Sequence, residues 1–319
     1  MGSLPIKKRY ENTNSVSCKD VYYNVKTRVH GNGLTEIRIY EKAIKVCVGK
    51  AETKLKYKKI DYGIVENCAF DENIEFRYVA DMEGFKHGVD KKAREAISLS
   101  KSVKRTRDKV FDYANSVVWE WFVTFTFDEN KVDRSDFGAV GKKLSVWLNN
   151  MRLKHCPDMK YVLVPERHKD GSWHFHGIFA NCDELDFVAA INQQKEFNGK
   201  PNKYYGQPLI RDGMQVYDMK KFRLGWSDCT KVRDTKKVAN YILKYITKEM
   251  VVDTPNRKRY WNSKNLTPVK EYNDFTDIEH ESFATSKIVE CLKKNPDTYC
   301  HTVEVQHGDF TNKITYIYC

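Results

Sequence analysis

The sequence has no paired cysteines, no long apolar run and no phosphate-binding loop. Its nine cysteines are scattered and form no CxxC pair, so neither a disulfide framework nor a four-cysteine zinc site is indicated. Apolar runs of about 18 residues, which a membrane helix needs, do not occur, and the first residues contain no apolar signal segment. We therefore expect a soluble, cytoplasmic protein with reduced thiols and no membrane partner.

The charge balance favours a polyanionic partner. The 319 residues include 55 Lys and Arg against 43 Asp and Glu, which gives a formal net charge of +12. Nucleic acid is a more probable partner than a membrane surface for a basic chain of this composition.

Pattern changes divide the chain into four parts. Residues 1–88 contain short alternating runs and predict a β-rich region of unassigned role. Residues 89–115 predict a helix with eight Lys or Arg between positions 91 and 109, residues 116–250 predict the central domain, and residues 251–319 predict an accessory segment.

The central domain is expected to be α+β, with an antiparallel sheet and helices packed on one face. Strands are predicted at 121–127, 160–168, 172–180 and 225–232, and helices at 135–155 and 234–250. This order of strands and helices is typical of an α+β sandwich.

Two histidines occupy alternate positions of one predicted strand, in "SWHFHGIFA". Alternation places His174 and His176 on the same face. A three-residue loop ending at Gly171, in the left-handed conformation, would place Glu166 directly opposite His174. One carboxylate and two imidazoles with open positions suit a catalytic divalent ion, with Mn²⁺ or Zn²⁺ fitting and Mg²⁺ tolerated. The alternative is a pair of sheet histidines with a purely structural role.

A stripe of tyrosine and lysine follows the predicted helix 234–250. Tyr241, Lys244, Tyr245 and Lys248 lie at i, i+3, i+4 and i+7, opposite the apolar residues of the same helix. We expect both phenols on an exposed face. Adjacent ammonium groups favour a phenolate nucleophile and stabilise charge on a phosphorane. A solvated helix face is the alternative interpretation.

Basic and aromatic residues elsewhere predict contacts with a DNA backbone and its bases. Trp226 and Trp173 are candidates for base stacking, although Trp173 is better explained by packing against the sheet. The expected backbone contacts are Lys101, Lys104, Arg105, Arg107, Lys231 and Arg233.

Three segments in this order, "FVTFTF", "HFHGIF" and "YILKYITK", resemble the motifs of the HUH endonucleases, which initiate rolling-circle DNA replication in phages, plasmids and small single-stranded DNA viruses. The resemblance spans about residues 121–248. It implies an endonuclease and strand transferase that nicks and rejoins single-stranded DNA through a 5′-phosphotyrosine.

The resemblance also implies roles for individual residues. His174, His176 and Glu166 match the metal ligands, and Tyr241 and Tyr245 match the tyrosine pair of the two-tyrosine class, with Lys244 and Lys248 as the accompanying lysines. The implied partners are an origin hairpin or single strand and, because no GxxxxGK[ST] loop occurs, a host helicase and polymerase. A phage or plasmid gene would place the protein in the host cytoplasm.

Three other functions are compatible with parts of this pattern. A transposase or relaxase would use the same chemistry in another biological context. A zinc hydrolase would use Glu166, His174 and His176 with Cys182, and would not need the tyrosines. A non-catalytic DNA-binding repressor would account for the charge alone.

Overall fold

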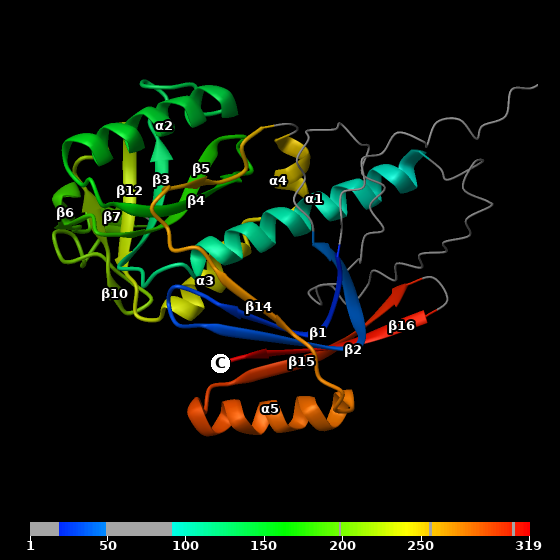
Figure 1. Ribbon diagram of the computed structural model, residues 1–319. Helices are drawn as coiled ribbons and strands as arrows, with labels where there is room; N and C mark the ends of the chain where they lie inside the picture. Colours follow the sequence, from blue (N-terminus) through cyan, green and yellow to red (C-terminus); the bar gives the residue numbers. More distant parts are fainter. Residues whose placement is uncertain (1–18, 49–90, 198, 255–256, 308–309) are drawn as a thin grey trace, which may run out of the picture. The chain divides into compact units, whose positions relative to one another are not determined.

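The chain divides into two compact units. The computed structural model describes residues 19–48, 91–197, 199–254, 257–307 and 310–319 (Figure 1). One unit comprises residues 30–34 and 87–270 and is called the seven-stranded unit below; the other comprises residues 1–29, 35–86 and 271–319 and is called the five-stranded unit.

The seven-stranded unit is built on an antiparallel sheet whose order is β13-β4-β5-β3-β12-β11-β6. The predicted strands are present at the sheet centre and the predicted helices lie around it, so the α+β prediction is confirmed. The strands are β3 (Trp121–Phe127), β4 (Lys160–Arg167), β5 (Trp173–Ala180), β6 (Phe187–Ala189), β11 (Tyr217–Met219), β12 (Gly225–Lys231) and β13 (Trp261–Asn262). The helices are α1 (Lys91–Ala114), α2 (Phe137–Lys154), α3 (Thr235–Leu243) and α4 (Lys248–Asp253).

A short ribbon joins β6 to β11. It contains the strands β7 (Glu196–Phe197), β8 (Lys200–Pro201), β9 (Ile210–Arg211) and β10 (Met214–Gln215). A 3-10 turn at Asp183–Leu185 precedes β6.

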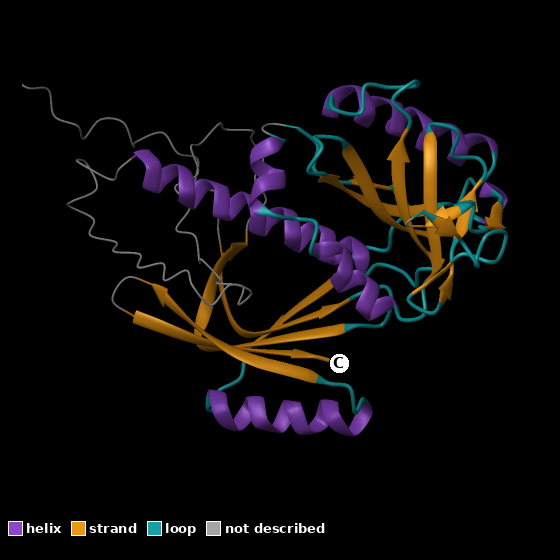
Figure 2. Ribbon diagram, turned by 180° about the vertical axis from the view of Figure 1, so that it is seen from behind, coloured by secondary structure: helices purple, strands orange, loops and turns teal. Residues whose placement is uncertain are grey.

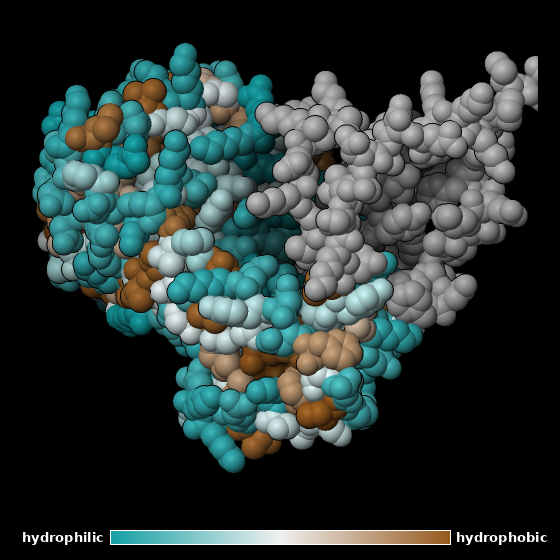
Figure 3. Space-filling view, viewed as in Figure 1, coloured by the Kyte–Doolittle hydropathy of each residue, from teal (hydrophilic) through white to brown (hydrophobic). Residues whose placement is uncertain are grey.

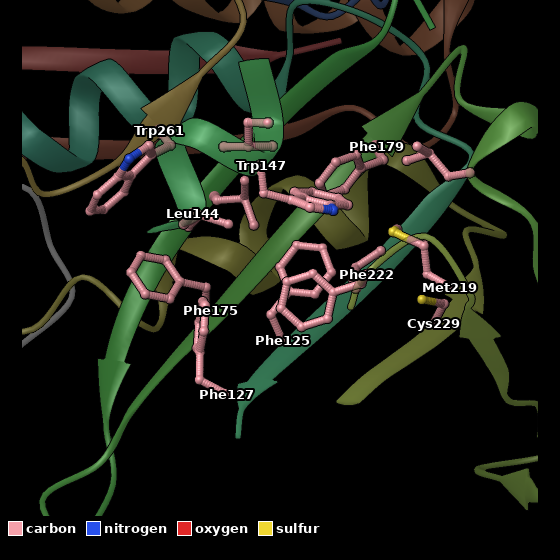
Figure 4. Packing of buried hydrophobic residues seen from close by; sticks show 14 of the residues in the cluster. Phe125, Phe127, Leu144, Trp147, Phe175, Phe179, Met219, Phe222, Cys229 and Trp261 are labelled. Carbon is pink, nitrogen blue, oxygen red and sulfur yellow. The ribbon is translucent and has the colours of Figure 1, made fainter. Parts of the chain in front are cut away.

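One face of the seven-stranded sheet is covered by α2. Asp136 caps this helix by accepting a hydrogen bond from the Gly138 amide. Alternate residues of β3, among them Phe125 and Phe127, are fully buried beneath the helix and lie in one core with Phe175 of β5 and Trp147 of α2 (Figure 4). The strand predicted at 121–127 is therefore confirmed, and its burial alternates from residue to residue.

The opposite face is covered as well, so the prediction of helices on one face only is wrong. A second core joins Val162, Val164 and Ile178 of the sheet to residues of α1, α3 and α4. Figures 1 and 2 show α2 on one side of the strands and α1 with α3 on the other. The physical reason is visible in β4, where three consecutive apolar residues are buried because both faces of the strand are covered.

The five-stranded unit combines segments from both ends of the described chain. Its sheet has the order β14-β1-β2-β16-β15, with β1 (Lys19–Val29), β2 (Thr35–Val48), β14 (Lys270–Asp274), β15 (Tyr299–His307) and β16 (Phe310–Tyr318). Helix α5 (His280–Lys294) packs on one face through Ala284 and Cys291. Residues 1–88 and 251–319 were predicted as separate parts, but strands from both pair within this sheet. Residues 1–18 and 49–88 of the predicted β-rich region lie outside the described residues.

The visible surface over α2 and its neighbouring strands is largely hydrophilic (Figure 3). This is the surface expected of a unit whose apolar residues fill two cores. No helix among the described residues is long and apolar enough to cross a membrane.

Gly225 allows β12 to approach β3. An ideal Cβ at this position would lie 2.0 Å from the Thr126 carbonyl oxygen and 2.8 Å from the Asp128 amide nitrogen. Gly225→Ala is therefore expected to lower the free energy of unfolding by about 1–3 kcal/mol, measured by denaturant titration. Gly138→Ala is the control, because there the nearest neighbour is the end of the movable Arg257 side chain. Equal stability of Gly225→Ala and the parent would contradict this account.

Candidate active site

The β4–β5 hairpin brings a carboxylate opposite the first histidine. The Gly171 amide bonds to the His168 carbonyl and the His168 amide to the Ser172 carbonyl, both at 2.9 Å. Gly171 has φ +86°, the left-handed conformation that the three-residue loop requires. Glu166 therefore pairs with His174, as the sequence predicts.

The same face carries the second histidine. His176 Nε2 lies 2.6 Å from Glu166 Oε2, the shortest contact of the three side chains. His174 Nε2 is 3.2 Å from Ser172 Oγ, and its ring stacks on His168 with centroids 3.8 Å apart. Among the residues that the structure describes, no group of three or more His, Cys, Asp or Glu is assembled as a metal site.

Two threonines of β3 orient the imidazole rings. Thr124 pairs with His176 and Thr126 with His174 across the sheet. Each threonine hydroxyl is 3.1 Å from the Nδ1 atom of its histidine. Both Nε2 atoms are therefore left for other partners. Their alternation in "FVTFTF" is the sequence signal from which a shared face could have been predicted.

The imidazoles are held in their neutral form. Burial lowers the pKa of His174 to about 4, and the charges of His168 and His176 act in the same direction. Burial also lowers the pKa of His176, against the opposing effect of its hydrogen bond with Glu166. Neutral imidazole is the form that binds metal ions.

The donor set fits a divalent cation by its chemistry. One carboxylate and two neutral imidazoles on one sheet face are ligands typical of Mn²⁺ and Zn²⁺. The threonine contacts to Nδ1 are the outer contacts that fix ligating histidines. Glu166, His174 and His176 are thus the residues of this face that would hold such an ion.

The helix that carries the tyrosines ends earlier than predicted. Instead of one helix over 234–250, α3 stops at Leu243 and α4 begins at Lys248. Between them the amides of Lys244, Tyr245 and Ile246 bond to carbonyls three residues back. Thr247 has an extended backbone and caps α4 by accepting from the Met250 amide, which is the physical reason for the break.

The two phenols differ in exposure, so the prediction that both are exposed is wrong for Tyr245. The side chain of Tyr245 is 8% exposed and its ring stacks on His176 with centroids 3.8 Å apart. Tyr241 is 45% exposed and packs edge-on against Phe122. The stretch from 244 onward leaves the regular helix, and this turns Tyr245 toward the sheet.

The tyrosine hydroxyls lie side by side. Tyr245 Oη donates to Tyr241 Oη over 3.2 Å, and Lys244 Nζ lies 3.5 Å from the Tyr241 ring centroid. Tyr245 therefore contacts His176 directly, and Tyr241 lies beside Tyr245. The side chain of Lys248 lies outside the described residues.

These contacts shift the pKa values of the two phenols in opposite directions. Burial alone would raise the pKa of Tyr241, but the hydrogen bonds from Lys244 and Tyr245 and the Lys244 charge together lower it. Burial raises the pKa of Tyr245, and the hydrogen bond that it donates to Tyr241 adds to the effect. Tyr241 is the phenol that ionises more readily.

Removing the Lys244 charge is expected to raise the Tyr241 pKa. The pKa rises because the ammonium group of Lys244 stabilises the phenolate, and Lys244→Gln removes that charge. Tyr241 should therefore ionise at higher pH in this variant. The measurement is the phenolate absorbance during alkaline titration. The contribution of Tyr241 is obtained by subtracting the titration curve of the Tyr241→Phe variant. Lys203→Gln, beside Tyr204, is the control. An unchanged Tyr241 transition in Lys244→Gln would show that the lysine has no such effect.

The basic residues predicted for DNA binding are not gathered beside the histidines. Lys231 pairs with Trp121 on the opposite face of the sheet, with Nζ 3.8 Å from the indole centroid. Arg233 donates to the Gly213 carbonyl. The other four lie on α1, where Lys101 and Arg105 are exposed and Lys104 and Arg107 are half-buried.

Cys182 lies away from the histidine face. It is fully buried in the core beneath α2, and burial raises the pKa of its thiol. It is therefore not placed to complete a site with Glu166, His174 and His176, as the zinc hydrolase alternative requires.

Comparison with known families points to DNA replication. Residues 120–250 match the family model described as replication-associated protein ORF2/G2P. The match suggests a replication initiator. It covers β3, the β4–β5 hairpin and the tyrosine segment, and so includes every residue of the site described above. No curated protein and no solved structure matches the chain.

Proposed function

We propose that the seven-stranded unit is a metal-dependent endonuclease and strand transferase that initiates rolling-circle replication. It nicks single-stranded DNA at an origin and rejoins it through a 5′-phosphotyrosine. The observation that carries the proposal is the stacking of Tyr245, whose hydroxyl bonds to that of Tyr241, on His176, which shares its sheet face with Glu166 and His174. The match to replication-associated proteins supports a role in replication initiation.

Glu166, His174 and His176 would hold the divalent ion, with Mn²⁺ or Mg²⁺ as the first candidates. When bound, the ion supplies Lewis-acid stabilisation of charge on the scissile phosphate. The threonine contacts to the histidine rings fix the positions of the ligating atoms before DNA arrives.

Tyr241 is the nucleophile for the first cleavage. Its hydroxyl is exposed, and its phenolate is stabilised by Lys244 and by the hydrogen bond from Tyr245. Its oxygen forms a bond to phosphorus as the bond from phosphorus to O3′ breaks. The phenol loses one proton and the departing O3′ gains one, so no further reactant is needed. Attack by a 3′-hydroxyl on the phosphotyrosine reverses the step and rejoins the strand.

Tyr245 is the second nucleophile. Once Tyr241 carries the DNA, the Tyr241 oxygen is esterified. The Tyr245 hydroxyl then no longer has a phenolate to which it can donate its hydrogen bond. The Tyr245 hydroxyl then lies beside the new ester, where it can attack a second strand after a round of synthesis.

The direct test is formation of a covalent protein–DNA adduct. The protein is incubated with Mn²⁺ and single-stranded oligonucleotides from its own replicon, and the products are separated on a denaturing gel. A labelled adduct that a chelator prevents is expected. Absence of an adduct with every oligonucleotide, in Mn²⁺, Mg²⁺ and Zn²⁺ alike, would overturn the proposal.

Loss of a threonine contact is expected to weaken metal binding without removing a ligand. Thr124→Val should lower Mn²⁺ affinity by about 10–100-fold, measured by calorimetry, because the His176 ring is no longer fixed through Nδ1. Thr230→Val, a change on β12 that leaves both histidine contacts intact, is the control. Equal affinities of the two variants would refute the orienting role.

A further inference from the structure

Trp226 differs from every other tryptophan of the chain. Five of the six are buried, with exposed fractions of 2–7% for Trp119, Trp121, Trp147, Trp173 and Trp261. Trp226 is 63% exposed; it lies near the start of β12, where β3 pairs with the strand and β11 pairs only further along, at Cys229. Trp173, the other stacking candidate from the sequence, packs in the core as expected.

Register places Trp226 in one row with the site. It pairs with Thr126, which pairs with His174, which pairs with Glu166. Directly paired residues of an antiparallel sheet point to the same face, so the indole is on the histidine side. Two strand spacings separate it from His174, or about 10 Å at about 4.8 Å per strand.

An ion pair lies on the same strand face as Trp226. Asp228, two residues along the strand and on the same face, is paired with Arg211 of the ribbon at 2.6 Å, and both side chains are exposed. An exposed ion pair of this kind contributes little to stability, so Arg211 can exchange Asp228 for a phosphate at small cost. An exposed indole on the same strand face as an ion-paired arginine offers both base stacking and backbone contact, the two contacts by which proteins bind single-stranded nucleic acid.

We infer that Trp226 is a stacking platform for a base of single-stranded DNA close to the scissile phosphate. The inference rests on the proposed function and adds a positioning residue to it. A base held on the indole fixes the strand two sheet spacings from His174, so that the phosphate is presented to the histidine face and to Tyr241. Every base has a stackable face, so this contact binds the strand without reading its sequence.

Binding of two probes tests the stacking role separately from nicking. Affinity is measured for oligo(dT) and for a strand of the same length that lacks all bases, both without metal. Trp226→Ala should weaken binding of oligo(dT) by about five- to 100-fold and leave binding of the abasic strand unchanged. Trp226→Phe should retain most of the affinity, because an aromatic face remains. Tyr299→Ala, at an exposed aromatic residue of the five-stranded unit, is the control.

Tryptophan fluorescence gives a second readout on the parent protein. Because only Trp226 is exposed, acrylamide should quench mainly this residue, and oligo(dT) should protect it from the quencher. Unchanged oligo(dT) affinity in Trp226→Ala, equal losses for both probes, or no protection would each overturn the stacking role. Because these measurements involve no cleavage, adduct formation can succeed while the inference about Trp226 fails, and the reverse.

Discussion

Tyr241→Phe is expected to lower the rate of adduct formation by at least about 10³-fold, as loss of a nucleophile does in other enzymes. The reason is that phenylalanine keeps the packing against Phe122 but has no oxygen to attack phosphorus. Tyr245→Phe is expected to slow the first cleavage by only about tenfold, because it removes one hydrogen bond to the nucleophile and keeps the stack on His176. The double variant should form no adduct. Initial rates on a denaturing gel provide the measurement.

Tyr204→Phe is the matched control for this series. Tyr204 is similarly exposed and also has a lysine over its ring, but it belongs to the ribbon. It should react as the parent protein does. If Tyr245→Phe abolishes the first cleavage and Tyr241→Phe does not, the order of the two tyrosines is reversed. An unchanged rate of adduct formation in the double variant would contradict the tyrosine mechanism.

Loss of the Glu166 charge should weaken metal binding and, as a result, lower the rate of adduct formation. Glu166→Gln preserves the shape of the side chain and a hydrogen-bonding partner for His176, but it replaces a carboxylate ligand by a weaker amide. Mn²⁺ affinity should fall by more than about 100-fold, beyond the loss typical of an outer-shell contact. Adduct formation should fall with it and recover partly at high Mn²⁺ concentration. Calorimetry and the gel assay measure the two effects separately.

Glu184→Gln controls for the general effect of removing a carboxylate. This residue contacts Cys156 beyond the far end of β5 and should leave metal binding and nicking unchanged. Full metal affinity in Glu166→Gln would exclude the carboxylate from the ligand set. Full activity after exhaustive chelation would exclude the metal altogether.

The local geometry of the β4–β5 hairpin could be predicted because all of its determinants are close in sequence. Gly171 fixes the loop type, the loop fixes the register, and the register places Glu166 opposite His174. The alternation in β3 could be predicted for the same reason, since the polarity of each residue in a strand indicates the sheet face on which it lies.

The break after Leu243 could not be predicted in the same way. Residues 244–250 contain helix-compatible side chains throughout, and Thr247, although favoured at a helix start, is also tolerated inside a helix, so the packing of α4 decides between the two. The burial of Tyr245 follows from this break. The apolar run in β4 is consistent with helices on both faces of the sheet. A short apolar run alone, however, does not distinguish a strand buried on both faces from a buried helical segment.

The five-stranded sheet illustrates a different limit. Pairing between Ile39 of β2 and Thr315 of β16 joins residues that are far apart in the chain, and nothing local in either strand specifies the other. This pairing also has a consequence for synthesis on the ribosome. Every strand of the seven-stranded sheet has been translated before β15 and β16 leave the exit tunnel, so the seven-stranded unit can fold before β14 and β16 are available to pair with β1 and β2. Nascent chains arrested once β13 has left the exit tunnel, and before β15 has done so, should therefore contain a protease-resistant core without the terminal sheet.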